Sequence, residues 1–156
     1  MREILFRGKR IDNGEWVYGF YVCIDNKHHY IFTGGKDTSG LYPTFLYHEV
    51  DPSTVGQYTG MTDRKGKKIF EGDLLSATIK AVVNKRINDW GLTDYDFEKK
   101  TAVWSVEWKV FNARHGFYVY GKDRRFHALL SNSIMINCDC EVIGNIHDNI
   151  KLLKGN

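Results

Sequence analysis

The chain has 156 residues, of which 42% are hydrophobic, 14% aromatic and 26% charged. This mixture is typical of a folded domain and excludes the disordered class, which combines low hydrophobicity with high charge. No segment approaches the roughly 20 apolar residues of a membrane span, and no apolar signal core follows the N-terminus, so we expect a cytoplasmic protein without a membrane partner. The net charge of +3 is too small to indicate polyanion binding by itself.

The first third of the chain predicts antiparallel hairpins. Two apolar runs, residues 4–7 and 16–21, flank Asn13-Gly14, a dipeptide that favours a type I′ hairpin turn. A second turn is expected at residues 25–27, where small polar side chains interrupt the apolar pattern. Residues 33–40 contain three glycines and no apolar side chain, which predicts a loop.

The middle of the chain predicts further turns and one long strand. Residues 51–54 are expected to turn the chain, and residues 65–67 to form a tight hairpin turn. Residues 84–100 lack a clear period, which favours an insertion or a short helix. Residues 101–110 alternate cleanly and therefore predict a strand. Its apolar face would hold Ala102, Trp104, Val106, Trp108 and Val110.

The C-terminal part of the chain is predicted to contain both strands and short helices. We expect a short helix or strand over residues 128–135, a strand over 141–146 and a helical turn over 148–153. Short strands at hairpin spacing, with glycines at the bends, favour a small barrel or roll over a βαβ sheet. The sequence therefore predicts a mainly β fold of antiparallel hairpins with short helical segments.

The most informative stretch is residues 55–75, VGQYTGMTDRKGKKIFEGDLL, where turn glycines and small polar residues recur among apolar positions. Together with EVIGN at residues 141–145 and REILFR near the start, it resembles the YopX-like proteins of bacteriophages and prophages. Met61 stands for the leucine of that pattern and Phe70 for its tyrosine. The resemblance implies an SH3-like small barrel, a phage or prophage source and a bacterial host cell, and it transfers no catalytic residue.

We expect a single domain over residues 1–156, with a finer division into a hairpin lobe, about 1–55, and a barrel lobe, 56–156. The physical interpretation of the signature is mainly structural, because glycines suit turns and apolar side chains suit a core. The expected core residues of the signature are Tyr58, Ile69, Phe70 and Leu74. Its acidic residues, Asp63, Glu71 and Asp73, remain candidates for contact with a partner or an ion.

One catalytic hypothesis concerns the Glu107-Trp108-Lys109 spacing. A carboxylate and an amine two residues apart lie on the same face of a strand, as nucleases of the PD-(D/E)xK type require, and Asp94 or Asp96 would supply the second carboxylate for Mg²⁺. The alternative is that Glu107 and Lys109 simply occupy the solvated face of an antiparallel strand.

A zinc hypothesis concerns Cys138 and Cys140, which would lie on the same side of a strand, with His147 or His127 completing the ligands. Structural zinc more often uses two C-x₂-C pairs, and free cysteine is commonly a small buried hydrophobic residue. The third cysteine is Cys23, and an odd number of cysteines favours reduced thiols over disulfides. We predict no cofactor.

Basic side chains that could hold the phosphates of a nucleic acid gather in two segments beyond the N-terminal one at residues 7–10. They are Arg64, Lys65, Lys67 and Lys68 in the first, and Lys122, Arg124 and Arg125 in the second. The alternative is that residues 64–68 form a solvated hairpin tip and that the nearby aromatic side chains belong to the core.

These observations favour a non-enzymatic binding module of a phage or prophage that contacts a host or phage protein and self-associates through open strand edges. The alternative from another class is a nucleic-acid-binding protein, with a metal-dependent nuclease as a third hypothesis.

Overall fold

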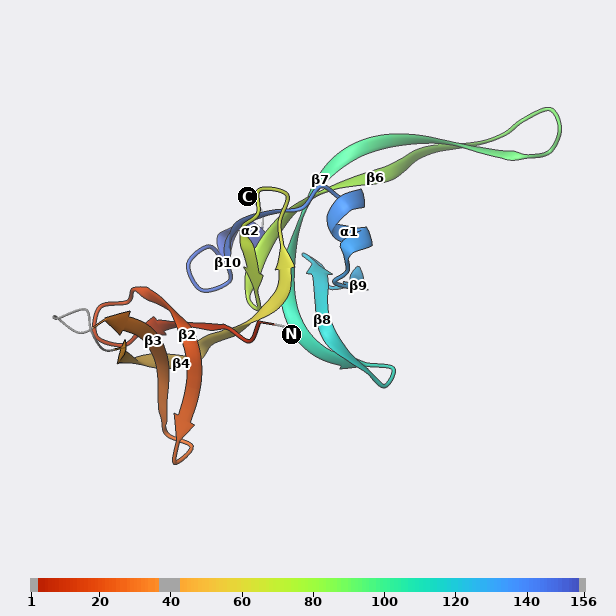
Figure 1. The fold of residues 1–156 in the computed structure, drawn as a ribbon. Helices are drawn as coiled ribbons and strands as arrows, with labels where there is room; N and C mark the ends of the chain where they lie inside the picture. Colours follow the sequence, from red (N-terminus) through yellow and green to blue (C-terminus); the bar gives the residue numbers. More distant parts are fainter. Residues whose placement is uncertain (1–2, 37–42, 155–156) are drawn as a thin grey trace. The chain divides into compact units, whose positions relative to one another are not determined.

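The computed structural model of the chain describes residues 3–36 and 43–154. Two antiparallel sheets account for most of these residues, and both helices are short (Figure 1). Backbone contacts divide the chain into two compact units: unit 1 comprises residues 1–62 and 66–72, and unit 2 comprises residues 63–65 and 73–156. The prediction of a mainly β fold built from antiparallel strands is confirmed.

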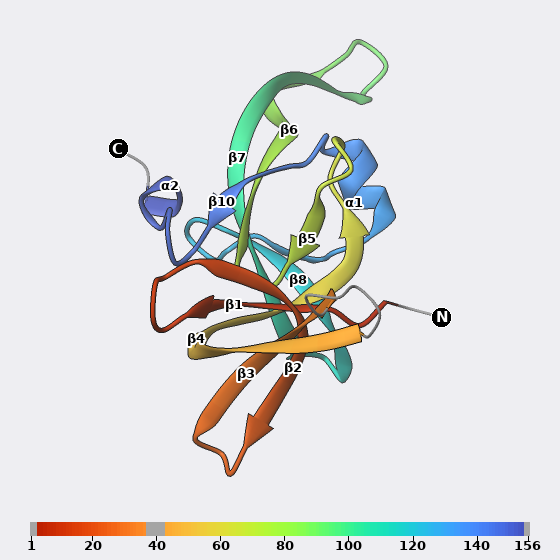
Figure 2. The same ribbon diagram turned by 60° about the vertical axis from the view of Figure 1, so that its left-hand side comes forward.

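Unit 1 contains a five-stranded sheet whose first four strands close on themselves (Figure 2). Its strands are β1 (Phe6–Arg10), β2 (Trp16–Ile24), β3 (His28–Lys36), β4 (Pro43–Thr62) and β5 (Lys68–Phe70). Each strand pairs with the next, and β4 also pairs with β1. The 20 residues of β4 make this possible, because its first part pairs with β3, its middle with β1 and its end with β5.

The type I′ turn occurs in the second hairpin of unit 1, not in the first. Between β2 and β3, Asp25 and Asn26 both have positive φ, 52° and 56°, and Lys27 N donates to Ile24 O at 3.1 Å. Between β1 and β2 the loop is longer, and its single positive φ is that of Gly14. The Asn13-Gly14 prediction was therefore wrong about the turn type but right about the hairpin.

The first part of the predicted loop and the whole of the predicted turn at residues 51–54 lie within strands. Residues 33–36 belong to β3, whereas residues 37–40 of the expected loop lie outside the described part of the chain. Residues 51–54 belong to β4, where the register with β1 shifts and polar side chains replace ladder bonds. Asp51 Oδ1 accepts from Ser53 N at 2.9 Å, and Thr54 Oγ1 accepts from Lys9 N at 2.9 Å.

Unit 2 contains the second five-stranded sheet, in the order β10-β6-β7-β8-β9. Its strands are β6 (Asp73–Ile87), β7 (Thr93–Phe111), β8 (Arg114–Gly121), β9 (His127–Leu129) and β10 (Glu141–Asn145). The helices are α1 (Asn132–Asn137), which is capped by the Ser131 hydroxyl, and α2 (Lys151–Lys154). Trp104 and Val106 of the predicted apolar face are buried, but Trp108 and Val110 are exposed.

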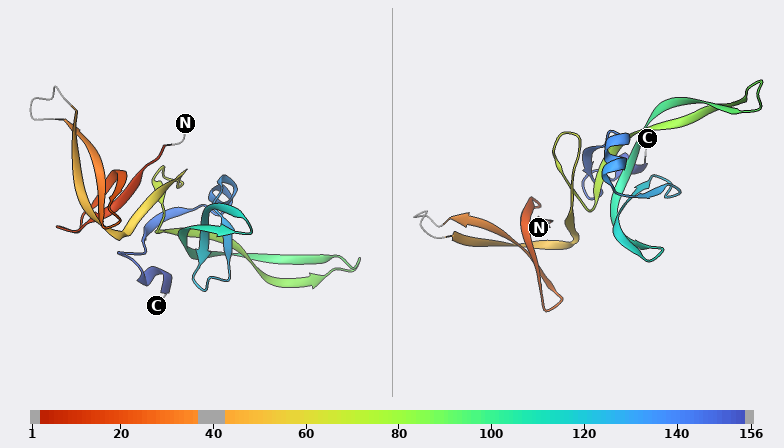
Figure 3. Two further views of the ribbon diagram at one scale, coloured as in Figure 1. Left: turned by 90° about the horizontal axis from the view of Figure 1, so that it is seen from below. Right: turned by 45° about the vertical axis from the view of Figure 1, so that its right-hand side comes forward.

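The outer parts of β6 and β7 form a two-stranded ribbon that extends beyond the rest of the sheet of unit 2 (Figure 3). Strand β10 pairs with β6 from Asp73 to Ser76, and β8 pairs with β7 from Trp104 onward. Among the described strands, residues 79–87 therefore pair with residues 93–100 alone, and we call residues 79–100 the ribbon. The short helix that was one alternative for residues 84–100 was wrong, because these residues lie in β6, in β7 and in the turn between them.

The expected core residues of the signature are buried. Tyr58, Ile69, Phe70 and Leu74 are each at most 7% exposed, which confirms the structural interpretation of these positions. Two of the three acidic residues of the signature, Asp63 and Asp73, are also buried, so they do not form an open acidic surface.

Gly56 of the signature lies where no side chain fits. A Cβ atom added to Gly56 would lie 2.6 Å from Glu71 O, a backbone atom. We expect Gly56→Ala to lower the free energy of unfolding by about 1–3 kcal/mol, because the two backbone segments must separate. Gly34→Ala is the matched control, since an added Cβ there meets nothing within 4 Å. Urea denaturation of both variants measures the difference, and equal midpoints would contradict the prediction.

Candidate functional site

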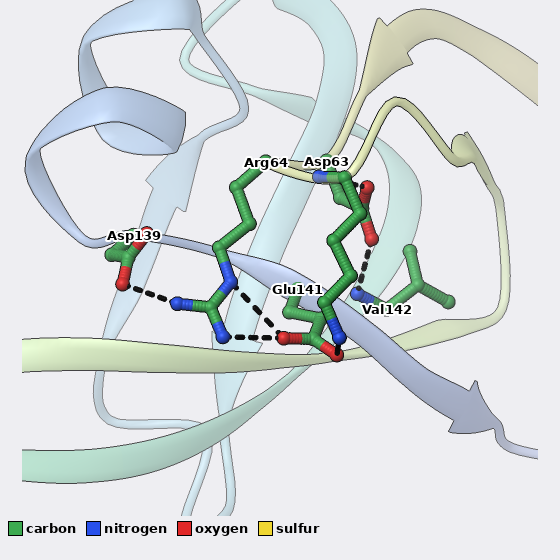
Figure 4. Close-up of polar contacts among 6 residues, drawn as sticks. Asp63, Arg64, Asp139, Glu141 and Val142 are labelled. Carbon is green, nitrogen blue, oxygen red and sulfur yellow. Dashed lines mark hydrogen bonds and ion pairs between the residues drawn. The ribbon is translucent and has the colours of Figure 1, made fainter.

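The two sequence motifs of the chain meet at the carboxylate of Asp63 (Figure 4). Asp63 is 6% exposed, and its Oδ2 accepts from Val142 N of β10 at 3.0 Å. Its Oδ1 accepts from Lys65 N at 2.8 Å, which holds the turn in shape. A carboxylate with two backbone amides as donors is a strong structural bond, since its charge strengthens each hydrogen bond.

The next two residues of the same turn form ion pairs with the segment that leads into β10 (Figure 4). The Arg64 guanidinium donates to Asp139 at 2.6 Å and to Glu141 at 2.5 Å, and Lys65 Nζ lies 2.6 Å from Glu141 Oε1. The Lys65 ammonium, followed by the Arg64 guanidinium, lowers the pKa of Glu141 below its ordinary value. Two of the predicted phosphate-binding cations are thus already matched by carboxylates.

Other cations of the predicted basic segments are also close to carboxylates. Lys68 pairs with Glu3 at 2.6 Å, Arg124 with Glu107 at 2.8 Å and Arg125 with Asp123 at 3.7 Å. Lys67 follows Gly66 in the turn before β5, and Lys122 lies in the turn after β8. Nearby carboxylates weaken the positive potential that would attract a polyanion to these turns.

The residues of the nuclease hypothesis do not gather at one point. Lys109 Nζ lies 3.4 Å from Glu107 Oε2, but Glu107 also accepts two bonds from Arg124, at 2.8 and 3.0 Å. These hydrogen bonds from Arg124 are the largest cause of the lowered pKa of Glu107. Asp94 lies on the same strand at a distance of roughly 40 Å along an extended chain, so it cannot share an ion with Glu107.

The residues of the zinc hypothesis do not gather either. Cys140 is fully buried, its Sγ donates to Ile134 O at 3.9 Å, and burial raises the pKa of its thiol to about 12. Cys138 ends helix α1, and His147 follows β10. In the described part of the chain, no three His, Cys, Asp or Glu side chains are grouped so that they could hold a metal ion.

The ribbon has one polar face, on which opposite charges are paired. Residues directly opposite each other in an antiparallel pair share a face, and the register places the acidic side chains of β7 on one side. The Arg86 guanidinium donates to both carboxylate oxygens of Asp96 at 2.6 Å, and Lys100 Nζ lies 3.6 Å from Glu98 Oε2. The cations of this polar face are thus balanced by carboxylates.

The opposite face of the ribbon combines apolar and cationic side chains, and we call it the cationic-aromatic face. Its members, given by the same register, are Lys80, Val82, Lys85, Ile87, Thr93, Tyr95, Phe97 and Lys99. The rings of Tyr95 and Phe97 lie 6.3 Å apart between centroids, which agrees with their lying on one side of β7. The three lysines form no ion pair with any side chain that the structure describes, and no carboxylate lies on this face.

The turn at the tip of the ribbon presents an exposed tryptophan. Asn88 Oδ1 accepts from Trp90 N at 3.2 Å and from Leu92 N at 2.9 Å, and Gly91 adopts the positive φ of 76° that the turn needs. The Trp90 side chain is 84% exposed. The backbone of this turn is therefore ordered by its own hydrogen bonds, while its largest side chain projects into solvent.

Sequence reasoning missed the ribbon, although a signal was present. Tyr95, Phe97 and Lys99 alternate with Asp94, Asp96 and Glu98, which is the period of a strand. On β6 the alternation is broken by a register shift between Val82 and Asn84, which hides the matching pattern.

Unit 1 carries a second exposed apolar surface, on the outer face of β2, β3 and β4. The register places Phe20, Phe32 and Tyr47 in one row across these strands, with Val22 and Tyr30 in the next. Phe20 is 64% exposed and Tyr47 is 67% exposed. We call this surface the aromatic face of unit 1.

Unit 2 also contains a pocket of about 620 Å³ against α2. Trp104 and Phe126 stack there with ring centroids 5.1 Å apart, and Leu152 and Leu153 line it as well. Among the described lining residues there is no carboxylate, imidazole or thiol, so the pocket suits an apolar group better than acid–base chemistry.

The comparisons with known proteins identify a family. A family model described as YopX protein matches residues 5–154, and because this match covers nearly the whole chain, the chain belongs to the YopX family. No curated protein matches the chain. Among the described residues, no helix is long and apolar enough to cross a lipid bilayer.

The hydrogen bonds that Asp63 accepts from Val142 N and Lys65 N predict a large effect on stability. Asp63→Ala leaves the amides of Val142 and Lys65 without their acceptor, and we expect the free energy of unfolding to fall by about 2–4 kcal/mol. Arg64→Ala removes only exposed ion pairs and should cost less than about 1 kcal/mol. Chemical denaturation compares the two variants, and a larger loss for Arg64→Ala would refute the assignment.

Proposed function

We propose that this member of the YopX family is a non-enzymatic binding module of a bacteriophage or prophage. It acts in the cytoplasm of the bacterial host and contacts a host or phage macromolecule. The observation that carries the proposal is the cationic-aromatic face of the ribbon, on which Ile87 is 72% exposed and Phe97 is 58% exposed. Contiguous exposed apolar side chains of this kind mark interaction sites in soluble proteins.

The composition of the ribbon supports this proposal. Tyrosine, tryptophan and phenylalanine are enriched in the buried centres of interfaces, and the ribbon exposes Tyr95, Trp90 and Phe97 together. The polar face, by contrast, is occupied by its own ion pairs, such as that of Arg86 with Asp96. The polar face thus presents charges that are already paired, whereas the cationic-aromatic face presents exposed rings and lysines to a partner.

The aromatic face of unit 1 supports self-association as a second property. In a dimer with twofold symmetry, the same surface of each copy faces its counterpart. Such a surface must therefore carry few charges of one sign, because these would repel each other across the interface. The described rows of this face contain no lysine or arginine, and Glu49 is their single carboxylate. Two copies of this face can therefore bury Phe20 and Tyr47 without bringing cations together.

A capture experiment tests the binding role of the ribbon. We expect the immobilised full chain to retain a specific protein or nucleic acid from host lysate and from phage-infected lysate. The double variant Tyr95→Ser, Phe97→Ser should retain at least about tenfold less, because it removes the rings that the partner covers. The control is Asp94→Ser, Glu98→Ser, which changes the opposite face of the same strand. Equal losses from both variants, or none, would contradict the proposal.

Self-association has its own test. We expect the wild-type chain to dimerise with rising concentration in sedimentation velocity, and Phe20→Lys to raise the dissociation constant at least about tenfold, because like charges then face each other. Ile87→Lys introduces the same charge on the ribbon and should leave the dimer intact. A chain that stays monomeric throughout, or one that responds to Ile87→Lys instead, would disprove this assignment of the interface.

A further inference from the structure

We infer that the cationic-aromatic face of the ribbon binds single-stranded nucleic acid. This inference rests on the proposed function, since it names the class of ligand for the same surface. It differs from the sequence-based expectation, which placed phosphates on the basic turns at residues 64–68 and 122–125. The structure assigns carboxylate partners to Arg64, Lys65 and Arg124 in those turns, whereas the ribbon lysines have none among the described residues.

The charge of the ribbon is separated between its two faces. Asp94, Asp96 and Glu98 all lie on the polar face, as do Arg86 and Lys100. The cationic-aromatic face contains Lys80, Lys85 and Lys99 and therefore has a formal charge of +3 from three lysines. A polyanion that lies along this face meets three ammonium groups and no carboxylate, although the whole ribbon is nearly neutral. The net charge of the ribbon therefore does not reveal the positive charge of this one face.

The lysines and the rings of this face lie next to one another in the register. Lys85 lies directly across from Tyr95, and Lys99 follows Phe97 by two residues on the same face. Proteins that bind single strands combine cations that follow the backbone with aromatic rings on which the bases stack. Tyr95 and Phe97 thus each have a lysine near them on this face, so a base stacked on either ring leaves its phosphate near an ammonium group.

A single strand fits this face better than a duplex does. A two-stranded ribbon can enter the major groove, where guanine is read by arginine or lysine and adenine by asparagine or glutamine. On the ribbon, Arg86 and Asn84 lie on the polar face and are bonded to Asp96. The cationic-aromatic face has no amide or guanidinium group, and its rings need bases that are free to stack. Unpaired bases meet this need.

A membrane surface is a weaker fit. A ribbon that inserted its tip into an anionic bilayer would carry the carboxylate of Asp89 in beside Trp90. An acidic group at that position opposes both insertion into the apolar layer and approach to anionic lipid. Vesicles are nevertheless included as an arm of the test.

The test is fluorescence anisotropy of the purified full chain with labelled oligo-dT of about 12 nucleotides, within the known site sizes of single-strand binders. The same measurement is made with oligo-U, with a duplex of equal length and with vesicles that contain phosphatidylserine. We expect both single strands to bind more tightly than the duplex. If three phosphates are neutralised, log affinity should fall with log salt concentration at a slope of about −2.

One matched pair of lysine variants and two ring variants locate the site. Lys99→Ala should weaken binding and reduce the salt slope by about 0.7. Lys100→Ala removes the same charge from the adjacent residue on the polar face and should change neither. Tyr95→Leu and Phe97→Leu keep an apolar side chain but remove the ring, and each should lower affinity about 5- to 150-fold through loss of stacking.

The outcomes separate this inference from the proposed function. Equal effects of Lys99→Ala and Lys100→Ala, or unchanged binding by the leucine variants, would overturn the inference. So would binding to vesicles or duplex in preference to both single strands. If no oligonucleotide binds while the capture experiment yields a ribbon-dependent protein, the proposed function stands and the ligand class is wrong. If capture is also independent of the ribbon, both fail.

Discussion

The bond from Val142 N to the Asp63 carboxylate is the interaction on which the arrangement of unit 2 depends. It fixes the start of β10 beside a turn that is distant in sequence, and β10 in turn pairs with the first residues of β6. The ribbon grows from the far end of β6, so the strand that carries the exposed face begins at a position set by this bond. The surrounding ion pairs of Arg64 and Lys65 are more exposed and contribute less stability.

This bond also joins the two segments on which the sequence-based resemblance to YopX-like proteins depended. The signature around Asp63 and the segment Glu141–Asn145 are two halves of one contact. Gly56, where an added Cβ would meet Glu71 O, and Gly66, with its φ of 82°, serve the local backbone geometry of the signature. The most recognisable residues of the chain thus stabilise a scaffold, whereas the exposed surfaces lie elsewhere, on the ribbon and on the outer face of β2, β3 and β4.

Much of the fold could be predicted from the sequence, because hairpin signals and buried apolar residues are local. The burial of Ile69 and Leu74 and the strand over residues 101–110 follow from such patterns. The ribbon could not be predicted as readily, because both of its faces are solvated and the register shift after Val82 breaks the period. Nor could the pairing of Arg64 with Glu141, 77 residues apart, because charge partners at that separation are chosen by the tertiary fold. The sequence therefore suggested that the basic side chains of residues 64–68 and 122–125 were available to bind phosphates, whereas in the structure several of them are paired with carboxylates.

The isolation of the ribbon has an evolutionary consequence. Among the described strands, no third strand pairs with residues 79–100, so cross-strand pairs can be gained or lost there without disturbing β8 or β10. Because side chains alternate with a period of two, removing two residues from each strand leaves every remaining ring and lysine on its original face, whereas removing one exchanges the faces. The length of the ribbon can thus vary between related chains in steps of roughly 7 Å, while the rest of the sheet of unit 2 stays unchanged.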